Sequence, residues 1–165
     1  MTTTDIFPLH EAARKGQVAP FNETVKEIAD LEVLDDKQRT PLHVAAIHNE
    51  STLGAYLCEI GANTDLQDQD GNTALHLAAI HGSRLFVSML LWAGIDFEIK
   101  NAQGNTALHE AVSAGNKDIS WLITENGGDV CVNFENNDGK TALDLAKEKG
   151  NQEIIDLLEE AQKSV

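Results

Sequence analysis

The sequence is poor in aromatic residues, although it is not poor in hydrophobic ones. Aromatic residues make up 5% of the 165 residues, whereas hydrophobic residues reach 42% and alanine and leucine abound. This composition favours small side chains packed between closely spaced helices over a β-sandwich, which draws on Val, Tyr and Trp. A chain of this length and hydrophobic content can bury the core of one ordinary domain. We therefore expect a folded, all-α protein.

Cysteines and long apolar runs are also scarce. The two cysteines, Cys58 and Cys131, lie far apart and lack the Cys-x-x-Cys spacing of a metal site. The N-terminus has no basic segment followed by an apolar run, and no apolar stretch reaches about 18 residues. We expect a reduced, cytoplasmic protein with no membrane association, and a leader removed from a longer precursor is the alternative.

Basic residues are outnumbered by acidic ones. The chain has 12 Lys and Arg against 27 Asp and Glu, a formal net charge of −15. Such a molecule repels nucleic-acid phosphates and anionic lipid surfaces, so we expect no nucleic-acid partner. The acidic surface can serve solubility alone, or it can match a basic partner surface.

An internal repeat is the main feature of the sequence. Leucines recur every 33 residues, followed by one step of 35, and threonine two positions before and alanine three positions after keep the same register in most copies. These columns contain Leu9, Leu42, Leu75, Leu108 and Leu143; Thr40, Thr73, Thr106 and Thr141; and Ala12, Ala45, Ala78, Ala111 and Ala146. A period of this length predicts a stack of small helical units.

Each unit contains signals for two helices and a turn. A first helix should end at a residue that tolerates positive φ, and that column holds Gly16, Asn49, Gly82, Gly115 and Gly150. Apolar residues at helical spacing then predict a second helix, which we expect to end near Gly61, Gly94 and Gly127. Tight-turn dipeptides follow at Asp70-Gly71, Gln103-Gly104 and Asp138-Gly139.

The unit resembles the ankyrin repeat, whose 33-residue period and Thr-Pro-Leu-His-x-Ala motif are matched in full by TPLHVA at residues 40–45. The resemblance implies a solenoid of helix-turn-helix units joined by β-turn or hairpin loops, forming a single domain over residues 1–165. We expect five repeats, at about residues 2–34, 35–67, 68–100, 101–135 and 136–162.

The end units depart from the motif. Phe7 replaces the threonine in the first unit, and Asp144 replaces the histidine in the fifth. Pro20 falls in the opening turn of the second helix of the first unit, where a proline is tolerated. We expect that helix to be short or tilted.

Four histidines, His10, His43, His76 and His109, occupy one motif column. The resemblance implies that such a histidine bonds to the motif threonine and to the backbone of an adjoining turn, so Thr40–His43, Thr73–His76 and Thr106–His109 would tie repeats together. His10 lacks its threonine partner. Neighbouring copies lie a full repeat apart, too far to share one zinc ion with ligands at about 2.0–2.1 Å. We expect structural histidines and no metal site.

Catalytic motifs are absent from the sequence. It contains no His-Glu-x-x-His, no Gly-rich phosphate loop and no Gly-x-Ser-x-Gly. We therefore predict a protein that is not an enzyme and has no cofactor.

The resemblance implies that partner proteins bind through the turn tips and the concave helix surface. At the end of the first helices, Ile47-His48 and Ile80-His81 place isoleucine where burial is not required, which indicates an interaction site; packing against neighbouring first helices is the alternative. The tip positions are Asp36, Lys37, Arg39, Gln69, Asp70, Asn72, Ala102, Gln103, Asn105, Asn137, Asp138 and Lys140. With Arg14 and Lys15, the N-terminal end of this surface is locally basic.

Two further departures lie in the second helices. Trp92 and Trp121 occupy columns that are four residues apart, one helical turn, and could form one patch on the outer face; lying over a repeat junction is the alternative. The step of 35 places two extra residues between Gly127 and Gly139, where they form either part of a binding loop or neutral drift.

These observations predict a non-enzymatic, monomeric protein-binding module. Since the chain is almost entirely repeats, occlusion of a partner surface, as in an inhibitor or regulator, is the favoured function. An adaptor or assembly chaperone that bridges two proteins is the alternative.

Overall fold

The computed structural model describes residues 8–24 and 31–163. Phe7 and the rest of residues 2–7 of the first predicted repeat therefore lie outside the described residues, as do residues 25–30. Within the described ranges the chain forms ten helices and no strand. They are α1 (Pro8–Arg14), α2 (Ala19–Thr24), α3 (Pro41–His48), α4 (Ser51–Glu59), α5 (Ala74–His81), α6 (Arg84–Trp92), α7 (Ala107–Ser113), α8 (Lys117–Val132), α9 (Ala142–Lys149) and α10 (Gln152–Lys163).

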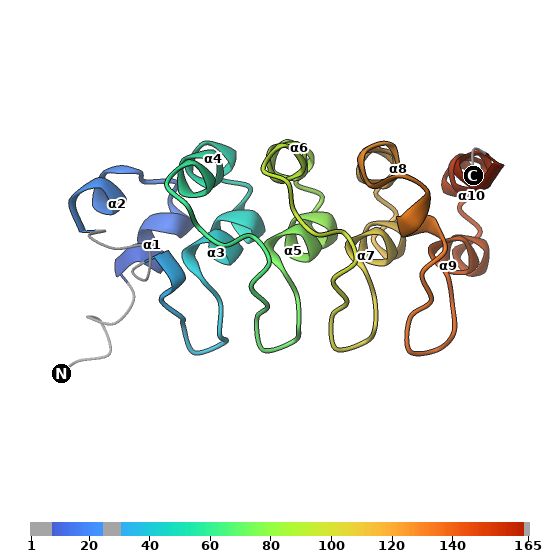
Figure 1. Ribbon diagram of the computed structural model, residues 1–165, viewed down its shortest axis with the longest axis horizontal. Coiled ribbons are helices and arrows are strands. Elements are labelled where there is room, and N and C mark those ends of the chain that lie inside the picture. The colour runs from blue at the N-terminus through green and yellow to red at the C-terminus, as the bar shows by residue number, and fades with distance from the viewer. Residues whose placement is uncertain (1–7, 25–30, 164–165) are drawn as a thin grey trace.

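The helices stack in two rows to form an elongated solenoid (Figure 1). The first helices α1, α3, α5, α7 and α9 pack one against the next, and the second helices α4, α6, α8 and α10 form a parallel outer row. Long loops between one pair and the next project to the same side, beyond the first helices. The predicted all-α ankyrin-type solenoid is confirmed.

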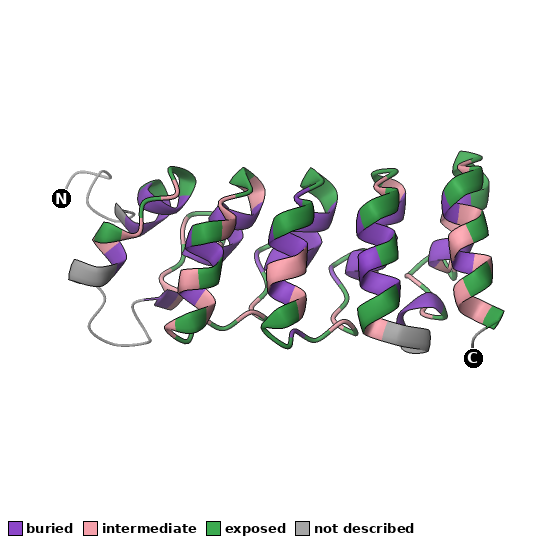
Figure 2. Ribbon diagram, turned by 90° about the horizontal axis from the view of Figure 1, so that it is seen from above, coloured by how far each residue is buried: buried purple, intermediate pink, exposed green. Residues whose placement is uncertain are grey.

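The core runs the length of the stack between the two rows. Figure 2 shows buried residues along the sides of the helices that face their neighbours and exposed residues on the outer row. The motif alanines Ala45, Ala78, Ala111 and Ala146 are fully buried at the contacts between first helices. A side chain of this size lets two helices approach closely, so the alanine column sets the spacing of the row.

The predicted end of the first helices is confirmed by the backbone. Gly82 and Gly150 cap α5 and α9 with φ of 74° and 66°, and Asn49 caps α3 with φ of 58°. A left-handed residue at this point lets its own N–H reach back to the last helical carbonyls. In the first unit, α2 has Pro20 in its opening turn, as expected, and the residues directly after Thr24 lie outside the described range.

The expected end of the fourth second helix at Gly127 is wrong. Helix α8 continues through Gly127 to Val132 and has 16 residues, against nine in α4 and α6. The added turn buries Cys131 and Val132 in the core. Gly127 lies against Phe97, whose ring carbon Cδ1 would be 3.1 Å from a Cβ at this position. The glycine here permits close packing within a helix, and residues 128–132, in the segment that holds the two extra residues, continue that helix.

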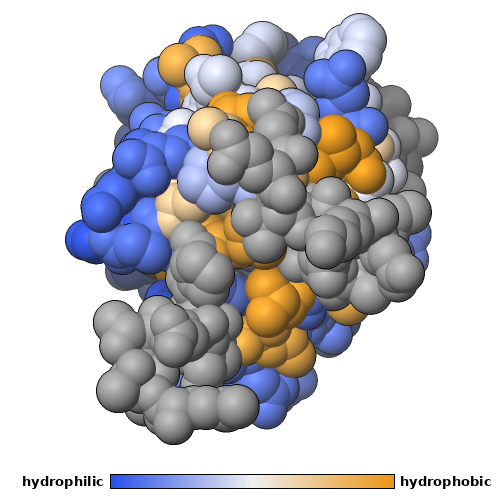
Figure 3. All heavy atoms as spheres, turned by 90° about the vertical axis from the view of Figure 1, so that its left-hand side faces the viewer, coloured by the Kyte–Doolittle hydropathy of each residue, from blue (hydrophilic) through white to orange (hydrophobic). Residues whose placement is uncertain are grey.

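Figure 3 views the solenoid from the end that carries α1 and α2. Hydrophobic surface is visible there beside hydrophilic surface and beside the residues whose placement is uncertain. Leu34, just before the turn at residues 36–38, is exposed. The visible part of this end is therefore not uniformly polar.

Candidate protein-binding surface

The motif threonine and histidine form a capping box at the start of each of three first helices. The N–H of Thr40 donates to Nδ1 of His43 at 3.1 Å, and the Thr40 hydroxyl lies 2.8 Å from the same nitrogen. The equivalent pairs Thr73–His76 and Thr106–His109 have the same two contacts. Histidine therefore takes the place that Glu or Gln usually holds in such a box.

The other ring nitrogen of each histidine reaches the next repeat. Nε2 of His43, His76 and His109 lies 3.0, 3.0 and 3.1 Å from the carbonyl oxygens of Asn72, Asn105 and Lys140. Since Nδ1 accepts a backbone N–H, Nε2 carries the proton and donates it to the carbonyl. Burial lowers the pKa of all three imidazoles below the usual value, and the hydrogen bonds to the carbonyls oppose that shift. A neutral ring with both nitrogens engaged acts as a tie and is not available for acid-base chemistry.

Each of the two end units keeps one of these two contacts, either the one to the next repeat or the capping one. His10, which lacks the motif threonine, still places Nε2 2.6 Å from the Arg39 carbonyl oxygen of the following repeat. Asp144, in the last unit, keeps the capping half: one carboxylate oxygen accepts from the Thr141 N–H at 2.9 Å and from its hydroxyl at 2.7 Å.

A second polar column, which lies outside the residues singled out from the sequence, organises the loops. Asp35, Asp68, Asn101 and Asn136 each accept two backbone N–H groups of their own turn through Oδ1, at 2.8–3.1 Å. These are Asx turns, in which a short side chain mimics a backbone carbonyl. A repeated Asp or Asn four residues before the Arg39, Asn72, Asn105 and Lys140 column is the sequence signal that could have revealed them.

Adjacent loops are joined directly by their backbones. Gln69 N–H donates to Lys37 O at 3.0 Å, Ala102 N–H to Asp70 O at 3.0 Å and Asn137 N–H to Gln103 O at 3.1 Å. The tips are therefore linked in a continuous series, which pre-orders the side chains they carry.

Two of the tip residues have their side chains occupied within the protein. Asn72 is buried, with 8% of its surface exposed, because its Oδ1 accepts from Asn101 Nδ2 at 3.0 Å. Asn105 donates to Glu110 at 2.9 Å and accepts from Asn136. The burial of Asn72 thus disagrees with the prediction that its side chain contacts a partner. Gln69, Asp70 and Gln103 are exposed.

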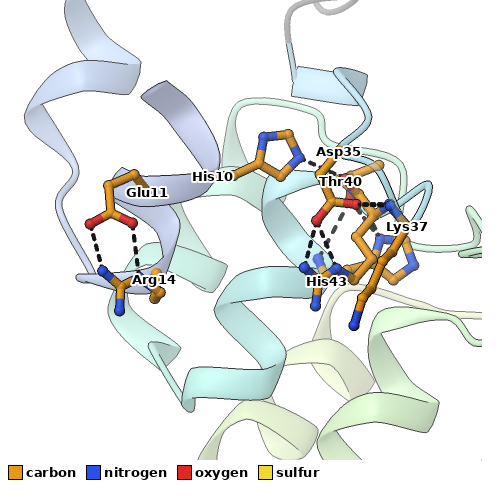
Figure 4. A network of polar contacts seen from close by, with 8 residues as sticks. His10, Glu11, Arg14, Asp35, Lys37, Thr40 and His43 are labelled. Carbon is orange, nitrogen blue, oxygen red and sulfur yellow. Dashed lines mark hydrogen bonds and ion pairs between the residues drawn. The ribbon is translucent and has the colours of Figure 1, made fainter. Parts of the chain in front are cut away.

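The predicted basic character of the N-terminal end is partly neutralised by local ion pairs. Arg14 and Lys15 both contact Glu11, at 2.6 and 2.9 Å, and the Arg39 guanidinium lies 2.6 Å from Asp35. Figure 4 shows the Arg14 guanidinium turned toward Glu11, and Asp35 within the same network as Lys37 and Thr40. Lys37 is exposed and uses its backbone N–H in the Asp35 turn.

The isoleucine-histidine pairs lie on adjacent first helices. Ile80 is exposed over 38% of its surface, and His48 and His81 are exposed, whereas Ile47 is half-buried against the core. Since α3 and α5 pack side by side, the two pairs form neighbouring parts of one surface at the ends of these helices. We call Ile47, His48, Ile80 and His81 the first-helix patch.

The two tryptophans line different grooves of the outer row. Trp92 is 94% exposed and Trp121 is 45% exposed. The α4–α6 groove, about 680 Å³, is lined by Ala55, Cys58, Glu59, Ser88, Met89, Trp92 and Ala93. The α8–α10 groove, about 470 Å³, is lined by Lys117, Trp121, Thr124, Glu125, Glu153, Asp156, Leu157, Glu160 and Ala161. The indoles therefore border two hollows separated by the packed pair α6 and α8.

Chemically reactive groups are few in the described part of the chain. Burial raises the pKa of the Cys58 thiol to about 11, and burial together with the charges of Glu98 and Asp96 raises that of Cys131 to about 12. No three His, Cys, Asp or Glu side chains among the described residues come together as a metal site. None of the helices described is long and apolar enough to cross a bilayer.

Stacked helix pairs with capping boxes, tied from one unit to the next and linked through projecting loops, define a helical repeat protein built for binding. The family model for ankyrin repeats, in three copies, matches residues 9–101 and 87–165. The chain belongs to the ankyrin repeat family, whose repeats are generally non-enzymatic protein-protein interaction modules. No curated protein matches the chain as a relative.

Proposed function

We propose that this protein inhibits or regulates another protein by covering one of its faces with the first-helix patch and the loop tips. The proposal rests on the exposure of Ile80. This β-branched apolar residue has 38% of its surface exposed and lies beside the exposed imidazole of His81. A large apolar side chain at the end of a helix that is otherwise buried in the row adds apolar area that a partner can cover.

Rigidity supports the same proposal. The capping boxes and the bonds between loops hold the patch and the tips in one arrangement before a partner arrives, so association loses little conformational entropy. Such a surface suits stable coverage of a partner's active site or binding face. In this proposal the protein performs no chemistry of its own.

The test begins by capturing a partner on the immobilised protein from its native lysate and identifying it by mass spectrometry. Binding of the purified partner is then measured for the double variant Ile80→Ala/His81→Ala. Leu85→Ala is the matched control, because Leu85 is a similarly large exposed apolar residue on the outer helix α6. We expect the double variant to bind at least about tenfold more weakly and the control to bind as the parent does.

Inhibition is tested separately from binding. The activity, or the next interaction, of the captured partner is measured with increasing amounts of this protein, and we expect it to fall to a plateau at a 1:1 ratio. A partner that binds through the first-helix patch and keeps its full activity and interactions would overturn the inhibitory function while leaving the binding function in place.

An adaptor function is the second candidate, favoured by the exposure of Trp92 and Trp121 on the outer row. It requires two partners with separate sites. Substitutions in the first-helix patch would then release one partner and substitutions of the tryptophans the other. Loss of both partners from either set of substitutions would contradict an adaptor.

A further inference from the structure

The α8–α10 groove combines an aromatic wall with carboxylates in a defined order. Helices α8 and α10 lie side by side in the outer row, at the end of the solenoid (Figure 1). On α8 the groove is lined by Lys117, Trp121 and Glu125, each four residues from the last, so they share one helix face. On α10, Asp156 and Glu160 are related in the same way.

The charges in this groove are unevenly distributed along it. Near the first turns of the two helices, Lys117 Nζ lies 3.2 Å from Glu153, and this ion pair joins the walls. Among the described lining residues, Lys117 is the one basic side chain, and its ammonium group pairs with Glu153 at this end of the groove. Farther along, Glu125 and Glu160 come from opposite walls, and Asp156 adds a third carboxylate, held on one oxygen by Gln152 at 2.7 Å.

We propose that this groove binds an arginine-bearing segment of a basic partner protein. A guanidinium is planar, so it can stack on the exposed face of Trp121 while its N–H groups donate to carboxylates at the rim. Because carboxylates line both walls, a cation placed between them is attracted by each wall. The net charge of −15 favours approach of such a segment over long range.

The α4–α6 groove provides an internal comparison. It is larger and contains a more exposed indole, Trp92, but its described lining residues include one carboxylate, that of Glu59. Its walls hold Ala55, Ala93 and Met89, which do not recognise a cation. Each groove therefore has an indole, but the two grooves differ in charge. We expect an arginine ligand to bind the α8–α10 groove in preference to the α4–α6 groove.

This inference does not rest on the proposed function. The α8–α10 groove belongs to the second helices, whereas the first-helix patch belongs to α3 and α5 in the other row. A negative result for one of these two surfaces would therefore not contradict the proposal made for the other.

The experiment uses each of the two tryptophans as a reporter. Trp92→Phe leaves Trp121 as the single indole, and Trp121→Phe leaves Trp92. Each protein is titrated with an eight-residue Gly/Ser peptide that carries three arginines, and with the same peptide containing citrulline, which keeps the shape and lacks the charge. We expect saturable quenching of Trp121 by the arginine peptide, at least about tenfold weaker binding of the citrulline peptide, and no response from Trp92.

A charge-matched pair of variants separates site binding from general attraction. The groove variant is Glu125→Gln/Asp156→Asn/Glu160→Gln, and the control is Asp36→Asn/Asp70→Asn/Asp138→Asn at the exposed loop tips. Both remove three negative charges from exposed positions, and circular dichroism verifies that both stay folded. We expect the groove variant to bind the arginine peptide at least about tenfold more weakly than the control. Equal weakening in both variants, equal binding of the citrulline peptide, or an unresponsive Trp121 would overturn the proposal.

Discussion

Nε2 of His76 lies 3.0 Å from the carbonyl oxygen of Asn105, 29 positions along the chain. The same imidazole accepts the N–H of Thr73 through Nδ1 at 3.3 Å. One side chain therefore starts its own helix and fastens the next loop. In a solenoid, where each unit buries its core only against its neighbours, such contacts between units carry the cooperativity of folding.

The first prediction concerns the removal of this tie. His76→Ala leaves the buried Thr73 N–H without its partner and removes one of the two donors to the Asn105 carbonyl, which keeps the Asn101 N–H at 2.9 Å. Because a buried polar group without a partner costs about 1–3 kcal/mol, we expect the free energy of unfolding to fall by about that amount. Urea denaturation followed by circular dichroism measures this change. Binding of a captured partner should persist below the lowered midpoint, because His76 is buried and cannot touch it.

His81→Ala is the matched control for this prediction. It removes the same side chain five residues farther along the same helix, at an exposed position, and should change stability by less than about 0.5 kcal/mol. Equal destabilisation by the two substitutions would contradict the role assigned to His76.

The second prediction is a loss of stability in mild acid. Burial lowers the pKa of His43, His76 and His109 in the folded protein below the unfolded value of about 6.5. Between the two pKa values the unfolded state binds more protons than the folded state. The stability contributed by the histidines is therefore complete above the unfolded pKa. It decreases as the pH falls toward the folded pKa and is constant below that pKa. For each histidine, a tenfold difference between the folded and unfolded acid dissociation constants corresponds to about 1.4 kcal/mol of stability. Urea midpoints measured from pH 8 to pH 5 should decline over this window.

A non-titrating variant assigns the effect to the histidines. In His76→Gln the side-chain oxygen can still accept the Thr73 N–H as in an ordinary capping box. The decline in stability with pH should be shallower for this variant than for the parent. Superimposable slopes would show that groups other than His76 control the acid response.

The sequence predicts the locally determined parts of the fold well. The ends of α3, α5 and α9 depend on one residue that adopts positive φ, and Asn49, Gly82 and Gly150 signal it directly. The end of α8 could not be predicted from the same signal. Gly127 stays helical because Phe97 packs on it and because the next turn buries Cys131 and Val132, and these are contacts between units.

The candidate site was predictable by position but not by exposure. Ile47 and Ile80 occupy one column, yet Ile47 is half-buried and Ile80 is exposed. Asn72 was expected at an accessible tip, and its amide is instead bonded to Asn101 of the next loop. Such differences arise from side chains of adjacent repeats, which a single column of the sequence does not contain.

The third prediction concerns the thiols. With pKa values raised by burial to about 11 for Cys58 and about 12 for Cys131, both should be protonated at neutral pH. Because the thiolate is the nucleophile, alkylation by iodoacetamide should be at least about a hundredfold slower than in the urea-unfolded chain. Cys131, which is fully buried, should react more slowly than the half-buried Cys58.

Single-cysteine variants make that comparison clean. Cys58→Ser leaves Cys131 and Cys131→Ser leaves Cys58, and mass spectrometry follows each modification with time. A rate in the folded protein close to the unfolded rate would reveal an activated thiolate and contradict the purely structural assignment.

The fourth prediction tests how closely adjacent loops are packed, using two glycines with the same backbone. Gly104 and Gly139 have φ of 75° and 71°, so alanine at either position adds similar left-handed strain, about 1–2 kcal/mol. A Cβ on Gly104 would lie 2.6 Å from the backbone nitrogen of Asn137, whereas one on Gly139 meets no atom within 4 Å. Gly104→Ala must therefore also push apart the loops that the Asn137 N–H···O Gln103 bond joins at 3.1 Å. We expect Gly104→Ala to lower the free energy of unfolding by at least about 2 kcal/mol more than Gly139→Ala in urea denaturation, because the backbone cannot shift without losing that bond. Equal losses would mean that the loops separate freely, and the tips would then not be the rigid surface on which partner coverage depends.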